Sequence, residues 1–224
     1  MKVYLVRHAE STDNYRHIYG GSGRDVDLTE LGMLQANELA NVFDGLSLRN
    51  LYSSPQLRAC RTASAILSRC PSTELELSDL IVERHFGSLE GKSYRVKHNE
   101  GVGDEPYSLV ARRVETFYLE VLKKQIFQIE HIDCIVVVSH GITLDYLLRV
   151  ILKDFSDDGL CTNGAFLSNA AYHLLEIDAV NKQLVSSHLN VKFHLADVKM
   201  KVSKTLSGVK YDSKQTRMDS FLKN

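Results

Sequence analysis

The chain has 224 residues, of which 44% are apolar and 25% charged, with a formal net charge of -1 and a pI near 6.8. A nearly neutral chain is not a general binder of polyanions, so we expect no direct nucleic-acid binding, and any attraction for anions must be local. Four scattered cysteines without a Cys-x-x-Cys pair fit neither a disulfide framework nor a zinc site.

The apolar segments of the chain are short. The first residues become charged too early for the apolar core of a signal peptide, and no apolar run approaches the length of a membrane-spanning helix. We therefore expect a soluble protein with no membrane partner, located in the cytoplasm or in the nucleus.

Short apolar runs alternate with helical periodicity, which is typical of an α/β domain. Residues 3–6 predict a buried strand at the start of the chain. Thr29 is a suitable N-cap for the first helix. Apolar residues follow at the spacing of one helix face: Ala36, Leu39, Ala40 and Phe43.

A second strand and a second helix follow directly. Residues 51–53 predict the strand, and Ser54-Pro55 has the order of an N-cap and a first helical residue. We expect this helix to continue through Ile66. Arg58 would then lie in its first turn.

The second half of the chain repeats the alternation. Residues 110–121 predict an amphipathic helix, and residues 134–138 are apolar throughout, as in a strand with both sheet faces covered. A helix follows Ser139-His140-Gly141, and residues 171–177 and 184–189 predict two late strands. The elements indicate a three-layer α/β/α domain with a mostly parallel central sheet, over residues 1–195.

The composition changes near Ala196. From Lys199 onward the chain has seven Lys or Arg residues against two Asp, with no sustained apolar period. This composition predicts a basic, disordered C-terminal tail over residues 196–224.

Polar residues with phosphate chemistry follow the predicted strands. Arg7-His8 comes directly after the first strand and His140 after the most apolar one, Arg58 lies in the first turn of a helix that also follows a strand, and Glu83 lies in a loop-like stretch. In open α/β sheets these strand ends form the ligand crevice. Arginine binds phosphoryl oxygens, neutral histidine can attack phosphorus, and a carboxylic acid can protonate a leaving oxygen. Each residue alone also has an ordinary structural interpretation, so the hypothesis rests on their joint placement.

The order of these motifs resembles that of the histidine phosphatase, or phosphoglycerate mutase-like, superfamily. The resemblance spans residues 1 to about 190 and is carried by residues 5–14, 27–32, 52–63, 83–91 and 138–141. It implies the phosphoglycerate mutase-like version of the predicted fold.

The resemblance also implies roles for the polar residues. His8 would become a phosphohistidine, and Glu83 would act as general acid and then as base for the attacking water. Phosphoryl oxygens would be held by Arg7, Arg58 and His140, and Asn14 would add a side-chain donor. No metal and no cofactor are implied, because the arginines and His140 supply the positive charge.

The length of one segment favours hydrolysis over mutase chemistry. Mutases of this superfamily that use 2,3-bisphosphoglycerate carry a long insertion before the second histidine, whereas here 57 positions separate Glu83 from His140. Arg112-Arg113 falls on the predicted amphipathic helix and is a poor site for a second anion. We therefore expect a phosphatase for a phosphorylated small molecule or a phosphopeptide, with a 2,3-bisphosphoglycerate-dependent phosphoglycerate mutase as the alternative.

The tail contains a segment that resembles the clamp-binding peptide called a PIP box. Gln215 is followed by Met218 and Phe221, which one helical turn would present together to a hydrophobic pocket of a sliding clamp. Leu222 stands where a second aromatic residue is usual. A chance match in a disordered tail is the competing interpretation. A further alternative is a catalytically idle binding module that is recruited to such a clamp.

Overall fold

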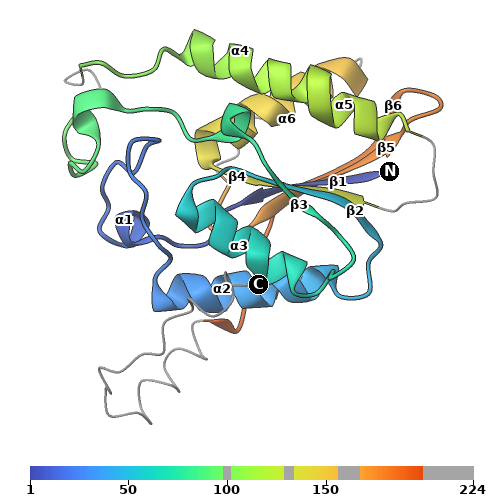
Figure 1. Ribbon diagram of the computed structural model, residues 1–224, viewed down its shortest axis with the longest axis horizontal. Coiled ribbons are helices and arrows are strands. Elements are labelled where there is room, and N and C mark those ends of the chain that lie inside the picture. The colour runs from blue at the N-terminus through green and yellow to red at the C-terminus, as the bar shows by residue number, and fades with distance from the viewer. Residues whose placement is uncertain (98–101, 129–133, 156–166, 199–224) are drawn as a thin grey trace.

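A six-stranded sheet lies at the centre of the molecule in the computed structural model, which describes residues 1–97, 102–128, 134–155 and 167–198 (Figure 1). The strand order is β3-β2-β4-β1-β5-β6. The four strands from β3 to β1 are parallel, and β5 and β6 are antiparallel to their neighbours. The strands are β1 (Lys2–Arg7), β2 (Leu48–Ser53), β3 (Leu75–Leu77), β4 (Cys134–Ser139), β5 (Tyr172–Asp178) and β6 (Gln183–Val191).

Helices cover both faces of this sheet, so the predicted three-layer α/β/α arrangement with a mostly parallel sheet is confirmed. In Figure 1, α4, α5 and α6 lie above the sheet, and α2 and α3 lie below it. The helices are α1 (Thr12–Tyr15), α2 (Glu30–Ala40), α3 (Leu57–Leu67), α4 (Tyr107–Phe117), α5 (Lys123–Ile126) and α6 (Gly141–Phe155).

Alternation along the strands divides the apolar side chains between two cores. All six residues of β4 are buried. Ile135 and Val137 join the core under α4 and α6, whereas Val136 and Val138 join the core under α2 and α3. Because successive strand residues point to opposite faces, a strand with both faces covered is apolar at every position.

The first predicted helix is confirmed with a small change at its end. Thr29 accepts a hydrogen bond from the Gly32 backbone N–H at 2.9 Å and so caps α2. Phe43 belongs to the apolar stripe and is buried, but it lies in a 3-10 turn, η1 (Asn41–Phe43), that continues from α2.

The predicted start of the second helix was wrong by two residues. α3 begins at Leu57 with Gln56 as its N-cap, and no side chain caps it. Ser54 does not cap the helix because its hydroxyl group contacts His140, 86 residues further along the chain. Arg58 nevertheless lies in the first turn, as expected.

The remaining predicted elements are present, and two further ones were not foreseen. The helix predicted over residues 110–121 comprises α4 and a π-helical turn, η5 (Tyr118–Leu122), and it continues into α5. The late strands are β5 and β6. The edge strand β3 and the single turn α1 were missed because three or four mostly unburied residues produce no period.

Residues 199–224 lie outside the described part of the chain. The predicted tail and the clamp-binding segment with Gln215, Met218 and Phe221 therefore stay predictions. Within the residues that the structure describes, no helix has the length and apolar character needed to cross a membrane.

Candidate active site

The carboxyl ends of β1, β2 and β4 meet at one edge of the sheet. Arg7 is paired with Ser139 at the ends of β1 and β4, and Ser53 is paired with Val138 at the ends of β2 and β4. The His8 N–H continues the pairing by donating to the Ser139 carbonyl at 2.9 Å. The predicted strand-end crevice is therefore formed.

A cavity of about 520 Å³ opens at this edge. Its lining includes five of the six residues predicted for the site: Arg7, His8, Asn14, Arg58 and Glu83. The sixth residue, His140, is fully buried behind the lining, with its ring centroid 5.1 Å from that of His8. The sequence-based set is thus brought together, with His140 at the back.

His8 is held in one tautomer by its own loop. Its Nδ1 lies 2.7 Å from the Ala9 carbonyl oxygen, which can only accept, so Nδ1 carries the hydrogen and Nε2 is unprotonated. Burial and then the charges of Arg58 and Arg7 hold the pKa of His8 well below its ordinary value. The ring is therefore a neutral base at neutral pH.

The loop that carries His8 is fixed to α3. The Ala9 N–H donates to the Thr62 hydroxyl at 3.0 Å, and this hydroxyl donates to the Arg58 carbonyl at 2.8 Å. Both bonds are buried. They set the distance between the histidine and the helix that carries Arg58.

His140 precedes α6 and forms a hydrogen bond with Ser54. Its Nε2 lies 2.9 Å from the Ser54 hydroxyl, which also accepts from the Gln56 N–H at 3.4 Å. A serine hydroxyl can donate one hydrogen bond while it accepts another, and donation to Nε2 would put the imidazole hydrogen of His140 on Nδ1. In the described part of the chain Nδ1 is buried without a hydrogen-bond partner, as expected of a donor that an anion would satisfy.

Both arginines are buried and anchored by carbonyl groups. Arg7 donates to the Leu167 carbonyl at 2.7 Å, and Arg58 donates to the carbonyls of Arg24 and Gly20 at 2.9 and 2.8 Å. Burial lowers the pKa of each arginine, and the nearby Glu83 carboxylate opposes this shift. The anchoring presents two guanidinium groups to the cavity in fixed positions.

Asn14 is oriented by the turn in which it lies. Its Oδ1 accepts hydrogen bonds from the Ser11 backbone N–H at 3.2 Å and from the Asn169 side chain at 3.0 Å. The amide NH2 is then the half of the side chain that remains to donate. Asn169 also donates to the His8 carbonyl, and no sequence signal marked it because it lies 155 positions from Asn14.

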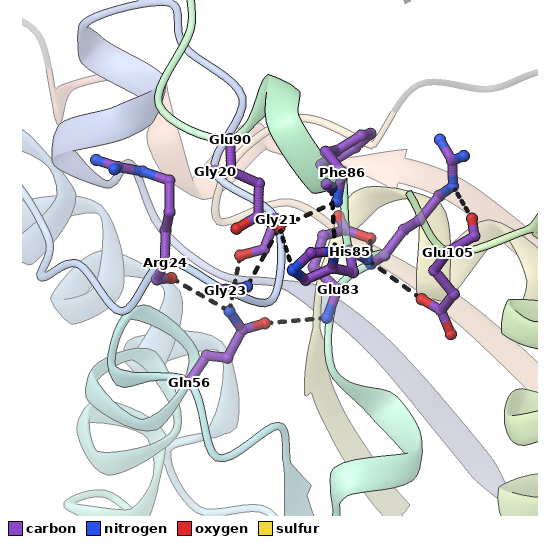
Figure 2. Close-up of polar contacts among 12 residues, drawn as sticks. Gly20, Gly21, Gly23, Arg24, Gln56, Glu83, His85, Phe86, Glu90 and Glu105 are labelled. Carbon is purple, nitrogen blue, oxygen red and sulfur yellow. Dashed lines mark hydrogen bonds and ion pairs between the residues drawn. The ribbon is translucent and has the colours of Figure 1, made fainter. Parts of the chain in front are cut away.

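Glu83 is half-buried beside the start of α6. Its Oε1 accepts from the Arg84 N–H at 2.8 Å, and its Oε2 lies 3.5 Å from the Ile142 N–H. Its own N–H donates to Oε1 of Gln56 at 3.0 Å. Figure 2 shows Gln56 between Glu83 and Arg24, with its Nε2 donating to the carbonyls of Gly21 and Arg24 at 3.1 and 3.4 Å.

Glu90 makes a second connection between the same two segments (Figure 2). Its Oε1 accepts from the N–H groups of Gly23 and Phe86 at 3.2 and 3.0 Å. A Cβ added at Gly21 would lie 2.2 Å from this carboxylate, so a close approach requires glycine there. Loop 20–24, which accepts from Arg58, is thereby fixed to the segment that carries Glu83.

The arginine pair on α4 does not enter the cavity. Arg113 donates to the Glu105 carboxylate at 2.9 Å and to the Val82 carbonyl at 2.7 Å. Neither Arg112 nor Arg113 belongs to the described lining. This placement agrees with the interpretation that the pair is not a second-anion site.

Residues 3–190 match the model of the histidine phosphatase superfamily (branch 1). The chain belongs to the histidine phosphatase superfamily. The residues that line the strand-end cavity all lie within this matched range.

Individual relatives of this histidine phosphatase agree with the family match. A protein of Schizosaccharomyces pombe named probable phosphatase is 37% identical over 97% of this chain and 78% of its own length. Phosphoserine phosphatase 1 of Hydrogenobacter thermophilus is 30% identical over 92% of this chain and all of its own length. The solved alpha-ribazole phosphatase of Shigella flexneri has the same fold, with a TM-score of 0.69 at 22% identity over 85% of this chain and 96% of that one.

The described residues contain no cluster of three His, Cys, Asp or Glu side chains that could hold a metal ion. The cavity's positive charge comes from Arg7 and Arg58. Arginine provides rigid bidentate donors for phosphoryl oxygens, so the arrangement can bind a phosphate dianion with these side chains alone.

Proposed function

We propose that the protein is a phosphatase that hydrolyses a phosphomonoester through a phosphohistidine intermediate on His8. The observation that carries this proposal is the contact between Nδ1 of His8 and the Ala9 carbonyl oxygen. Its Nδ1–H is bonded to the Ala9 carbonyl, so its Nε2 is unprotonated, and Arg7 and Arg58 line the same cavity as His8. A neutral histidine nitrogen beside two guanidinium groups is suited to attack a bound phosphoryl group.

The first step breaks the ester bond. Nε2 of His8 forms a bond to phosphorus while the bond from phosphorus to the ester oxygen breaks, and Glu83 in its protonated form gives its proton to that oxygen. Negative charge on the phosphoryl oxygens is balanced by Arg7 and Arg58. Nδ1–H of His140 and the Asn14 amide complete the set of donors.

The second step regenerates the enzyme. Glu83, now a carboxylate, takes a proton from a water molecule whose oxygen attacks phosphorus. The bond between phosphorus and Nε2 breaks, and inorganic phosphate leaves. Glu83 can serve both steps because its carboxylate lies on the cavity wall and is held by the N–H groups of Arg84 and Ile142.

A steady-state assay tests the proposal. Wild-type protein should release inorganic phosphate from p-nitrophenyl phosphate, and His8→Ala should lower kcat/KM by at least about a thousandfold, because covalent catalysis is lost. His188→Ala, at an exposed position of β6, is the matched control and should retain full activity. Equal rates for His8→Ala and wild type would refute the assignment of the nucleophile.

Mutase activity is the alternative that the cavity lining disfavours. A phosphoglycerate mutase must hold a second anionic group of its substrate, and the described lining contains no arginine or lysine besides Arg7 and Arg58. We therefore expect no conversion of 3-phosphoglycerate in the presence of 2,3-bisphosphoglycerate at high enzyme concentration. Conversion at a rate comparable with ester hydrolysis would favour the mutase.

Recruitment by the C-terminal tail and a cytoplasmic or nuclear location are the finer parts of the proposal. The spacing of Gln215, Met218 and Phe221 supports a sliding clamp as partner. The full-length chain should bind immobilised clamp protein at micromolar concentration, and Phe221→Ala should abolish binding but retain phosphatase activity. If the immobilised clamp retains the wild type and this variant equally, the proposal that the tail binds a sliding clamp is wrong.

A further inference from the structure

Five aromatic side chains line the cavity above the phosphoryl site. Tyr19 lies 5.0 Å from Tyr94 and 5.3 Å from Phe86, measured between ring centroids. Tyr107 and Tyr146 form a second, stacked pair with centroids 6.4 Å apart. All five belong to the cavity lining, and we call them the aromatic wall.

Two rings of the wall reach the solvent at the mouth of the cavity. Tyr94 and Tyr107 are 47% and 46% exposed, whereas Phe86 is 9% exposed. Aromatic rings offer a large contact area at a low cost in conformational entropy, since each has only two side-chain torsions. A planar group that enters the cavity can therefore contact rings on the wall before its phosphate reaches Arg7 and Arg58.

Arg84 contacts two rings of the aromatic wall, Tyr107 and Phe86. The Arg84 guanidinium lies 4.0 Å from the centroid of the Tyr107 ring and 5.4 Å from that of Phe86. Its Nε donates to the Glu105 carbonyl at 2.6 Å, and its Nη2 is paired with the Asp104 carboxylate. Because Arg84 is buried and is absent from the described lining, it orders the rings and does not itself receive an anion.

Charge on the lining distinguishes between classes of leaving group. In the described part of the cavity the cations are Arg7 and Arg58, and the carboxyl groups are those of Asp145 and of Glu83, which holds a proton in the proposed first step. Asp145 accepts from Arg149 at 2.9 Å, and Arg149 does not line the cavity. A second negative charge on the leaving group would find the Asp145 carboxylate and aromatic rings where it needs a cation.

On the basis of the proposed function, we propose that the substrate is a small phosphomonoester whose leaving group carries an aromatic ring and no second negative charge. The phosphoryl group lies at His8, and the ring lies against the aromatic wall. The cavity volume of about 520 Å³ suits a small molecule.

A pair of esters with leaving alcohols of similar acidity tests the ring preference. 2-Phenylethyl phosphate and butyl phosphate differ in the ring and hardly in chemical reactivity, so the ratio of their kcat/KM values reports contacts with the ring. We expect wild type to favour the phenylethyl ester by at least roughly tenfold. A ratio near one would overturn the proposal.

Variants of the aromatic wall test whether the preference for the phenylethyl ester comes from contacts with its rings. Tyr107→Ala should lower the ratio of the two kcat/KM values to within about twofold of one, and Tyr107→Phe should retain it, because the ring and not the hydroxyl group makes the contact. Leu109→Ala is the matched control on α4, since Leu109 is 51% exposed and does not line the cavity. Tyr146→Ala is the second test if Tyr107→Ala folds poorly, and an unchanged ratio in a folded variant contradicts the assignment.

A third ester tests the proposal that the leaving group carries no second negative charge. 2-Phenylethyl phosphate with a para carboxylate on the ring has the same reacting oxygen, and we expect its kcat/KM to be roughly tenfold lower. A higher value would overturn the exclusion of a second anion. Failure of wild type to hydrolyse any of the three esters would count against the proposed phosphatase activity itself, whereas equal hydrolysis of all three would contradict only the substrate class.

Discussion

Gln56→Leu removes the side chain that connects Glu83 to loop 20–24. Leucine has a similar size but can neither accept from the Glu83 N–H, now bonded at 3.0 Å, nor donate to the Gly21 carbonyl, now bonded at 3.1 Å. Gln56 is 6% exposed, so water does not readily replace it. A buried donor left without a partner costs about 1–3 kcal/mol. We expect the free energy of unfolding to fall by about 2 kcal/mol and the melting temperature by about 4–8 °C.

The same change should affect the reaction in a way that depends on the leaving group. Butyl phosphate needs a proton from Glu83 as its ester bond breaks, whereas p-nitrophenolate leaves readily without one. Displacement of Glu83 removes part of a general-acid contribution of about a hundredfold or more, so we expect kcat/KM for butyl phosphate, which reports only the steps up to cleavage of the ester, to fall at least about tenfold. The value for p-nitrophenyl phosphate should fall by less than about threefold under the same conditions.

Gln35→Leu provides the matched control for this experiment. The Gln35 side chain also accepts from a backbone N–H, that of Glu10 at 2.9 Å, but it does not contact Glu83. We expect this variant to lose stability without altering the ratio of the two kcat/KM values. If Gln56→Leu is destabilised but its ratio equals that of Gln35→Leu, the reasoning that Gln56 positions Glu83 is wrong.

Three further predictions concern stability and metal dependence. Burial lowers the pKa of His173 to about 4, so below pH 6.5 the unfolded chain binds more protons than the folded one. Because burial lowers the pKa of His8 and His140 in the same direction, urea denaturation should show a loss of at least about 3 kcal/mol between pH 6.5 and 4, and a flat profile would contradict it. Gly32→Ala would place a Cβ 2.0 Å from the Glu10 carbonyl oxygen and should cost about 1–3 kcal/mol in a thermal melt, whereas Gly141→Ala, with nothing closer than 3.8 Å, should not destabilise the fold. Phosphatase activity should be unchanged after dialysis against EDTA, because arginines supply the positive charge; recovery that requires an added divalent cation would refute this view.

The elements predicted best from the sequence are those whose burial is complete. Residues 134–138 of β4 are all apolar because both sheet faces are covered, and α2 has a capping threonine and a regular apolar stripe. Such patterns can be read from neighbouring residues, because a central strand is buried on both faces and a covering helix is buried on one. The edge strand β3, with three residues and incomplete burial, offers no comparable pattern.

The candidate site was predicted in part for a related reason. Arg7, His8 and His140 lie at the ends of strands that the apolar pattern of the sequence predicts. Their convergence at one edge of the sheet could therefore be expected. The roles of Ser54, Gln56 and Asn169 depend on contacts with residues 27 to 161 positions away. The Ser54-Pro55 pair even suggested a helix cap, because the local preference could not reveal that His140 would use the hydroxyl group.

Rapid-quench trapping of the phosphoenzyme tests the central claim most directly. Wild-type protein mixed with p-nitrophenyl phosphate and quenched within one turnover should carry one phosphoryl group on His8, labile in acid and stable in alkali, as a nitrogen–phosphorus bond requires. Peptide mapping should place the group on the peptide containing His8, and His8→Ala should carry none. An acid-stable phosphoryl group, or one that maps to another residue, would contradict the account.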